Sequence, residues 1–257
     1  MILALDIGNT NMTLGGFEED RLVFVSRFST HRSKTQDEVA IIVLEALRLH
    51  GVSASRVRGA AVSSVVPPLN AAVRGAIRFL FGFEAVFVGP GIKSGIRICC
   101  DHPASVGSDL ICAAVAAHSL YGENALIVDL GTATKMTVVD EKGAFLGTSI
   151  IPGVQMGLDA LAEHAAQLPR IGLELPKSVI GKNTADCMRS GVVFGAAAMI
   201  DGMILRICEE FGSPLRVIAT GGLSSLIVPL CKSEISVEEN LVLVGLKLLY
   251  LKNTGEP

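Results

Sequence analysis

The sequence lacks a marked excess of either charge. Its 257 residues include 22 Lys and Arg against 25 Asp and Glu, which gives a formal net charge of −3 at pH 7. Nonspecific attraction to a nucleic acid backbone or to an anionic membrane needs a basic excess, and none is present. The composition therefore predicts a small-molecule partner, and neither nucleic acid nor membrane is expected as a partner.

Cysteine spacing, leader features and long apolar runs are also missing. The cysteines lie at positions 99, 100, 112, 187, 208 and 231, without the C-x-x-C pairs of a zinc site or the density of a disulfide scaffold. The chain enters an apolar strand at once, without the basic start of a signal peptide. Its most apolar windows are too short for a membrane span or contain Asp201. We therefore expect a soluble cytoplasmic protein with reduced thiols.

Several motifs that would assign a reaction class are broken or absent. Gly181-Lys182-Asn183-Thr184 looks like the end of a Walker phosphate loop, but Pro176 replaces its first glycine and Asn183 its Ser or Thr. No G-x-G-x-x-G follows a strand, as a dinucleotide site would require. Neither H-E-x-x-H nor G-x-S-x-G occurs. P-loop enzymes, dinucleotide oxidoreductases, zinc hydrolases and serine hydrolases are therefore disfavoured.

The chain does contain one structural unit twice. The apolar run Ile2–Leu5 ends in Asp6-Ile7-Gly8-Asn9-Thr10, and the apolar run Ala125–Val128 ends in Asp129-Leu130-Gly131-Thr132-Ala133. The strands that follow each turn match at the same offset. Each half therefore opens as strand, polar turn, strand, short turn and strand.

Alternating helical and strand patterns complete both halves and predict mixed sheets with helices on their faces. In the first half we expect helices at about 37–50 and 69–81 and strands at 59–64 and 85–88. In the second half we expect helices at about 154–167, 184–211 and 237–251 and a strand at 215–219. A helix opened by Pro103 and reaching Tyr121 is expected to join the halves. The predicted domains are 1–117 and 118–257.

Both Asp-x-Gly turns are typical of phosphate chemistry. A glycine after the carboxylate lets phosphate oxygens approach the backbone, whose N–H groups can converge on an anion. Asp6 or Asp129 can hold a hydrated Mg²⁺ together with nucleotide phosphates. A single turn of this kind is most often an ordinary strand end, so the prediction depends on the repeat. Extra donors are supplied by Asn9, Thr10, Thr13, Thr132 and Thr134.

Further motifs follow in a fixed order along the chain. They are Ser63-Ser64-Val65-Val66-Pro67, Pro103 with Gly107-Ser108-Asp109, Ile151-Pro152-Gly153, Leu168-Pro169, Gly181-Lys182-Asn183-Thr184 with Ser190-Gly191, and Thr220-Gly221-Gly222. Together with the two Asp-x-Gly turns, this series resembles the type III pantothenate kinases over essentially the whole chain. The resemblance implies a duplicated actin-like (ribonuclease H-like) α/β fold with a nucleotide cleft between its domains. It also implies transfer of the ATP γ-phosphoryl group to pantothenate, which gives 4′-phosphopantothenate in the first step of coenzyme A biosynthesis.

The resemblance implies roles for individual residues and a homodimer. Asp109 would be the catalytic base, Asp6 would hold Mg²⁺ through water, and Asp129 would hold a monovalent cation, K⁺ or NH₄⁺. The implied ATP-binding residues are Asp6, Ile7, Gly8, Asn9, Thr10, Asn11, Met12, Thr13 and Thr132. The implied substrate-binding residues are Cys100, Gly107, Ser108, Asp109, Leu110 and Thr184. Without the surrounding motif, Asp109 is better interpreted as an acidic residue that caps a helix N-terminus.

Three positions depart from the family pattern. Leu110 stands where the family has arginine, Cys100 where it usually has tyrosine, and Lys135 where it usually has a small hydroxyl residue. Leucine cannot pair with a substrate carboxylate, and the nearest cations in sequence are Arg97, His102 and Lys135. Two alternatives follow, namely a kinase-like paralogue with a changed acceptor or reduced activity, and a non-catalytic nucleotide-binding regulatory protein.

Lys135 itself has three interpretations. Its ammonium could replace the monovalent cation expected at Asp129, or it could pair with the acceptor carboxylate. It could also face solvent, because Thr134 and Thr137 leave the alternation of this strand ambiguous.

Overall fold

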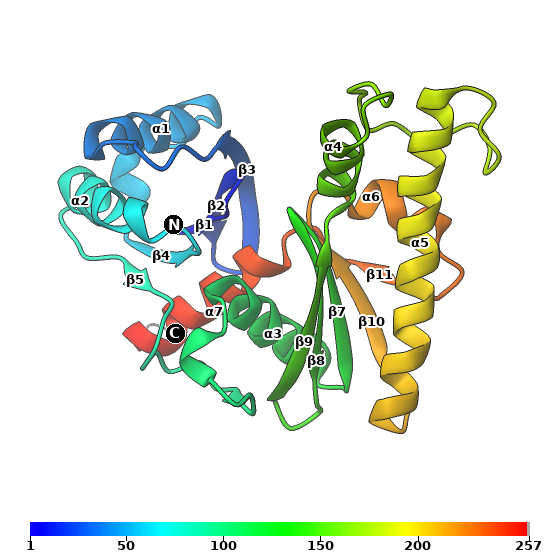
Figure 1. Ribbon diagram of the computed structural model, residues 1–257. Coiled ribbons are helices and arrows are strands. Elements are labelled where there is room, and N and C mark those ends of the chain that lie inside the picture. Colours follow the sequence, from blue (N-terminus) through cyan, green and yellow to red (C-terminus); the bar gives the residue numbers. More distant parts are fainter. Residues whose placement is uncertain (256–257) are drawn as a thin grey trace. The chain divides into compact units, whose positions relative to one another are not determined.

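The computed structural model describes residues 1–255 and divides the chain into two compact units. The first unit contains residues 1–119 and 241–255, and the second contains residues 120–240. Each is built on a mixed sheet with helices packed against it (Figure 1). The domains expected from sequence differ from this division in the last helix, which packs with the first unit. Chain order alone does not reveal which sheet a terminal helix covers.

The first unit's sheet has the strand order β3-β2-β1-β4-β5. Strand β2 runs antiparallel to β1 and β3, whereas β4 runs parallel to β1 and to β5. The strands are β1 (Ile2–Ile7), β2 (Asn11–Glu18), β3 (Arg21–Ser29), β4 (Gly59–Ser64) and β5 (Val86–Phe87).

The second unit's sheet repeats that topology. Its own strands follow the order β9-β8-β7-β10-β11, with β8 antiparallel to its neighbours and β10 parallel to β7 and β11. The duplication expected from the two Asp-x-Gly segments is therefore confirmed. The strands are β7 (Ala125–Leu130), β8 (Ala133–Val139), β9 (Ala144–Pro152), β10 (Arg216–Thr220) and β11 (Ser236–Val237).

Local sequence signals account for several helix ends. Thr35 and Glu38 form a capping box at the start of α1, and Gly82 and Gly212 take left-handed conformations after α2 and α5. The helices of the first unit are α1 (Gln36–Leu49), α2 (Asn70–Phe81), α3 (Ser108–Tyr121) and α7 (Leu241–Thr254). Those of the second are α4 (Val154–His164), α5 (Thr184–Phe211) and α6 (Ser224–Ile227).

Two expected helix starts are wrong. Pro103 opens a 3₁₀ turn (Pro103–Ser105), and α3 begins only at Ser108. The last helix begins at Leu241 instead of Val237, because Val237 ends strand β11. The short elements α6, β11 and β6 (Arg97–Ile98) were not predicted, since pieces of this length carry no readable periodicity.

Strand alternation decides which side chains reach which helix layer of the first unit. In β1, Leu3, Leu5 and Ile7 pack in the core that α1 and α2 cover. Ile2 and Ala4 lie in the opposite core, which α3 and α7 cover. Because successive strand residues face opposite sides, Asp6 belongs to the α3 and α7 face.

Helix α5 is the one helix among residues 1–255 that is long and apolar enough to cross a membrane by length and composition alone. Its residues Val193, Ala197 and Ile200 nevertheless pack in the core of the second unit. Asp201, in the middle of this helix, accepts hydrogen bonds from the backbone N–H groups of Lys232 and Ser233. One face of α5 therefore belongs to the folded unit.

The packing of α7 on α3 generates a stability prediction. A Cβ atom at Gly245 would lie 1.9 Å from the carbonyl oxygen of Cys112, so Gly245→Ala should destabilise the protein by about 1–3 kcal/mol through overpacking. The matched control is Gly157→Ala in α4, where a Cβ atom meets nothing within 4 Å. That change should stabilise by about 0.5–1 kcal/mol through helix propensity. Urea unfolding measures both, and equal midpoints would contradict the close α3 and α7 contact.

Candidate functional site

The first Asp-x-Gly turn is held by the end of strand β3. The Gly8 N–H donates to the Asn11 carbonyl oxygen at 2.9 Å, which closes the turn. Thr30 donates its hydroxyl to the Gly8 carbonyl at 2.8 Å and its N–H to the Thr10 carbonyl at 2.9 Å. The expectation that the turn's N–H groups converge on an anion is therefore wrong for Gly8, whose N–H is used inside the turn.

The predicted ATP-binding segment 6–13 mixes core and exposed residues. Ile7 and Met12 are fully buried in the first unit, so only their backbone atoms can face a ligand. Asn9, Thr10 and Asn11 are exposed. Thr30, which fixes this segment, was not predicted, because a threonine so far along the chain carries no local signal.

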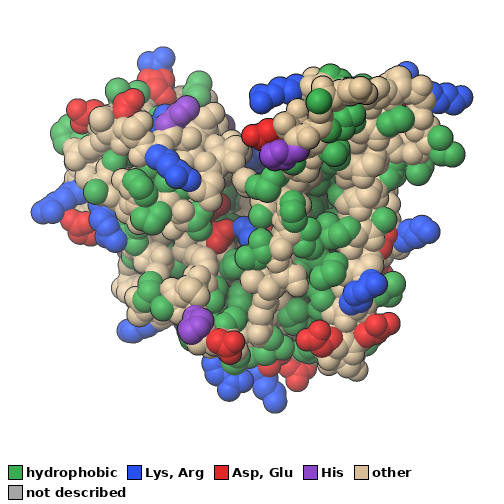
Figure 2. Space-filling view, in the orientation of Figure 1, with side chains coloured by type: hydrophobic (Ala, Val, Ile, Leu, Met, Phe, Trp, Pro, Cys, Tyr) green, Lys and Arg blue, Asp and Glu red, His purple; other side chains and the backbone are tan. Residues whose placement is uncertain are grey.

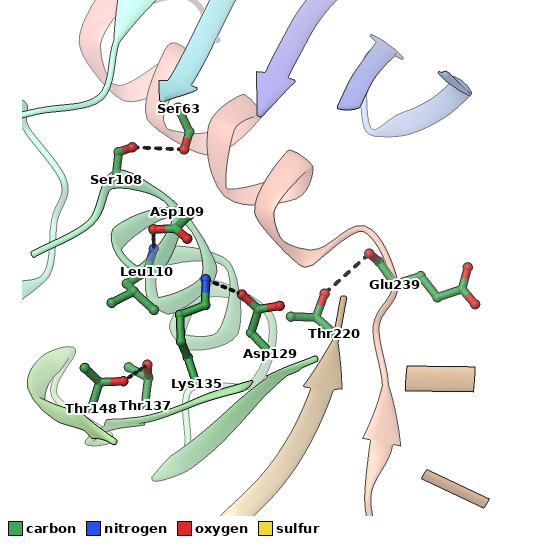
Figure 3. Close-up of polar contacts among 10 residues, drawn as sticks. All are labelled: Ser63, Ser108, Asp109, Leu110, Asp129, Lys135, Thr137, Thr148, Thr220 and Glu239. Carbon is green, nitrogen blue, oxygen red and sulfur yellow. Dashed lines mark hydrogen bonds and ion pairs between the residues drawn. The ribbon is translucent and has the colours of Figure 1, made fainter. Parts of the chain in front are cut away.

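Helix α3 is tied to the end of strand β4 by buried serines (Figure 3). The Ser108 hydroxyl shares a hydrogen bond with the Ser63 hydroxyl at 3.0 Å and accepts the Ser64 N–H at 3.0 Å. Ser63 lies beside Asp6 in the register of β4 and β1. The first turn of α3 is therefore anchored next to the strand position that bears the Asp6 carboxylate.

Asp109 occupies the first turn of α3, where a glycine gives its carboxylate room. One carboxylate oxygen accepts the Leu110 N–H at 2.9 Å. A Cβ atom at Gly107 would lie 2.5 Å from that same oxygen, Oδ1. Gly107 thus leaves room for the Asp109 carboxylate, and Ser108 anchors the helix turn that bears it. The next residue, Leu110, is buried at 8% exposure.

The thiol of Cys112 is buried in α3 and is influenced by the carboxylates of Asp6 and Asp109. Burial raises the pKa of Cys112 well above its usual value, and the Asp6 and Asp109 carboxylates raise it further. Burial is the largest cause of the shift, and the two carboxylates add to it. Asp6 faces the α3 and α7 side of the sheet and Asp109 lies in the first turn of α3, so the first unit presents two acidic groups on this face.

The second Asp-x-Gly turn carries a cross-strand ion pair (Figure 3). Asp129 in β7 is directly opposite Lys135 in β8, and the Lys135 Nζ lies 2.7 Å from Asp129 Oδ2. The two side chains are 17% and 16% exposed, for Lys135 and Asp129 respectively. The solvent-facing interpretation of Lys135 is therefore wrong, because its neighbour across the strands is this carboxylate.

Glycines of two turns surround the other oxygen of Asp129. A Cβ atom at Gly221, whose φ is +92°, would lie 2.7 Å from Asp129 Oδ1, and one at Gly131 would lie 3.4 Å away. The Leu223 N–H donates to the Leu130 carbonyl at 3.2 Å and joins the two turns. The Thr220-Gly221-Gly222 motif and the Asp129 motif therefore form one site within the second unit.

Helix α4 begins against the same turn. A Cβ atom at Gly153, the N-cap of α4, would lie 2.1 Å from the Thr132 carbonyl oxygen. Thr132 itself is exposed. The positive end of the α4 helix dipole therefore lies beside the turn, an arrangement that suits a bound anion.

The remaining predicted substrate residues lie on other elements. Cys100, partly exposed, follows the short strand β6, and Arg97 and His102 nearby are exposed. Thr184 is exposed in the first turn of α5 in the second unit, where Asn183 accepts the Asp186 N–H at 2.9 Å. The Gly181–Thr184 segment is thus a helix cap, which agrees with rejecting it as a phosphate loop.

Comparison with known proteins gives a full-length match. The family model described as type III pantothenate kinase matches residues 2–206. A protein named type III pantothenate kinase from Geobacter sulfurreducens is 41% identical over 253 residues, covering 98% of this chain and 99% of that protein.

Solved structures show the fold. A putative Baf family transcriptional activator from Campylobacter jejuni has a TM-score of 0.61 at 16% identity, covering 99% of this chain and 100% of that chain. A ROK family protein from Streptococcus pneumoniae, in complex with sucrose, has a TM-score of 0.58 at 12% identity, covering 100% and 99%. The expected duplicated actin-like α/β fold is confirmed.

Proposed function

Because the chain belongs to the type III pantothenate kinase family, we propose that it transfers the γ-phosphoryl group of ATP to the primary hydroxyl of pantothenate. The observation that carries this proposal is sequence identity of 41% over 98% of the chain. The products are ADP and 4′-phosphopantothenate. That the nucleotide lies between the two units stays a prediction.

Asp109 is the proposed base. Phosphoryl transfer requires a group that orients the acceptor hydroxyl and receives its proton while the new P–O bond forms and ADP leaves. The Ser108 anchor and the clearance at Gly107 support this role, because the first fixes the start of α3 and the second leaves room for the Asp109 carboxylate. Gly107 and Ser108 are accordingly proposed as positioning residues of the substrate site.

ATP binding is assigned to the segment from Asp6 to Thr13 and to Thr132. Among residues 1–255 no three His, Cys, Asp or Glu side chains are grouped to hold a metal by themselves. Mg²⁺ usually keeps several waters and binds through one or two carboxylates plus nucleotide phosphates, and a strand-end carboxylate such as Asp6 fits that pattern. When bound, Mg²⁺ supplies charge neutralisation on the transferred phosphate.

The monovalent cation expected at Asp129 does not fit the groups present. One oxygen of the Asp129 carboxylate already pairs with the Lys135 ammonium, and the other lies between Gly131 and Gly221. A second cation about 4 Å from the ammonium would be repelled by about 4 kcal/mol at an effective dielectric constant of 20. No step of the proposed reaction is therefore assigned to K⁺ or NH₄⁺.

The acceptor pocket is the least conventional part of the proposal. Leu110 cannot donate the paired hydrogen bonds that arginine offers to a carboxylate. The Cys100 side chain is shorter than that of tyrosine, so its thiol cannot extend as far as a tyrosine hydroxyl would. A hydrogen bond to a charged group contributes about 1.5–3 kcal/mol, so we expect pantothenate affinity about one to two decades lower than with arginine. Thr184 remains a proposed pantothenate contact.

A regulatory module without catalysis is disfavoured. The Campylobacter jejuni protein described as a putative transcriptional activator shares only 16% identity with this chain, which shows the fold and nothing of the activity. On the face drawn in Figure 2, basic and acidic side chains are interspersed and do not form a basic patch. Sequence identity of 41% over 98% of the chain to a type III pantothenate kinase favours the catalytic proposal over a regulatory module.

A homodimer through α5 is part of the proposal. Small residues Gly191, Gly195 and Ala198 are exposed along one stripe of the helix, and Ile180 beside it is 80% exposed. Neighbouring helices approach closely over small residues, and an exposed apolar surface of this kind marks an interface. A second copy of this chain is the occupant that the family resemblance implies.

The catalytic proposal predicts the behaviour of Asp109→Asn. The variant should bind Mg-ATP with near-normal affinity, while pantothenate-dependent ADP production falls by about two decades or more. Asp101→Asn, at an exposed position upstream of the helix, is the matched control and should remain active. Near-normal turnover of Asp109→Asn would remove this residue from the mechanism.

The acceptor proposal predicts that Leu110→Arg tightens pantothenate binding by about one to two decades, because a charged donor then faces the carboxylate. Leu110→Met keeps the volume without the charge and should leave the affinity unchanged. Calorimetric titration with pantothenate measures both. Weaker binding in the arginine variant alone would indicate a pocket shaped for a different acceptor.

The dimer proposal predicts that Gly195→Arg yields monomers. A Cβ atom at Gly195 meets nothing within 4 Å, so the single chain tolerates the change while an α5 interface does not. Glu209→Arg, exposed near the end of the same helix, should stay dimeric. Light scattering after gel filtration measures the mass, and a dimeric Gly195→Arg variant or a monomeric unmodified protein would contradict this interface.

A further inference from the structure

The two units offer an internal comparison at the carboxylate of each Asp-x-Gly turn. In the first unit the residue directly opposite Asp6 across the hairpin is Thr13. In the second unit the residue directly opposite Asp129 is Lys135. The same place in the duplicated topology therefore holds a neutral hydroxyl once and an ammonium once.

The ammonium of Lys135 is fixed by its surroundings within the second unit. Its Nζ lies 2.7 Å from Asp129 Oδ2, and on the other side strand β9 places the apolar residue Ile150 beside it. The side chain is only 17% exposed, so solvent screens the pair incompletely. A lysine held in this way places its ammonium directly on the Asp129 carboxylate.

The charge matters because of what surrounds Asp129. Gly131, Gly221 and the start of α4 at Gly153 leave the backbone approachable and favour an anion, as described above. An uncompensated carboxylate at that point would repel the phosphates of a nucleotide. The ion pair cancels this repulsion without any ion from solution.

We infer that Lys135 is the resident cation of the second glycine turn, which neutralises Asp129 so that ATP binds and reacts without a bound monovalent cation. This inference rests on the proposed kinase function. It makes Lys135 a positioning residue for the nucleotide phosphates. Its consequence is an enzyme whose ATP affinity and turnover do not respond to K⁺.

The test compares KCl with N-methylglucamine chloride at equal ionic strength, using the full chain. Calorimetric titration with the magnesium complex of a non-hydrolysable ATP analogue reads affinity, and ADP production with pantothenate reads turnover. The unmodified protein should give equal values in both salts. Lys135→Thr, which restores a hydroxyl as at Thr13, should lose about tenfold or more in affinity without K⁺ and recover it with K⁺.

Two further variants make every outcome decisive. Lys142→Thr, in the exposed turn between β8 and β9, is the matched control and should behave as the unmodified protein. If Lys135→Thr binds poorly in both salts, Lys135→Arg decides, because a retained charge should keep binding independent of K⁺. Loss of binding in the arginine variant as well would overturn the inference.

Activation of the unmodified protein by K⁺ would also overturn it, as would undiminished affinity of Lys135→Thr without K⁺. Failure of the proposed function looks different. If pantothenate yields no ADP in any salt, the acceptor assignment fails, while the nucleotide titrations still report on Lys135.

Discussion

Two carboxylates of this protein are held against backbone at points where only glycine leaves room. A Cβ atom at Gly107 would lie 2.5 Å from an oxygen of Asp109, and one at Gly221 would lie 2.7 Å from an oxygen of Asp129. Contacts this short are not available to any other residue without displacement of the acid. Both acids therefore occupy space that a glycine leaves open, and the chemistry proposed for the site depends on that space.

The duplicated topology supplies an Asp-x-Gly turn twice, with Asp6 in the first unit and Asp129 in the second, and the two turns have different surroundings. In the first unit, hydrogen bonds from Thr30 and the Ser63 and Ser108 pair bring a strand end and a helix start together around acidic groups. In the second unit, Lys135 converts the corresponding acid into a neutral pair. The two turns therefore differ in the residue that faces the carboxylate, which is Thr13 in the first unit and Lys135 in the second.

Much of this arrangement could be predicted from the sequence because it depends on patterns among residues that are close together in the chain. The two Asp-x-Gly turns predicted the repeat, and the bounds of β4 and α5 agree with the expected 59–64 and 184–211. Contacts between elements that are far apart in the chain have no such local pattern. The packing of α7 on the first unit depends on the fit of Gly245 against Cys112.

The facing direction of Lys135 was also hidden, since polar Thr134 and Thr137 disguise the alternation of β8, and both threonines are in fact buried. The partnership of Ser63 with Ser108 joins residues far apart in the chain, and only the folded β4 and α3 reveal it. The helix start at Ser108 was missed because a proline-led 3₁₀ turn looks like a helix opening.

Phosphorus NMR of a mixture of the protein, Mg-ATP and pantothenate tests the central claim most directly, because it identifies both products at once. The account predicts that ADP and a new phosphomonoester resonance appear in equal amounts, that both require pantothenate, and that neither forms with Asp109→Asn on the same time scale. ADP accompanied only by inorganic phosphate, or a phosphomonoester that forms equally well with Asp109→Asn, would contradict it.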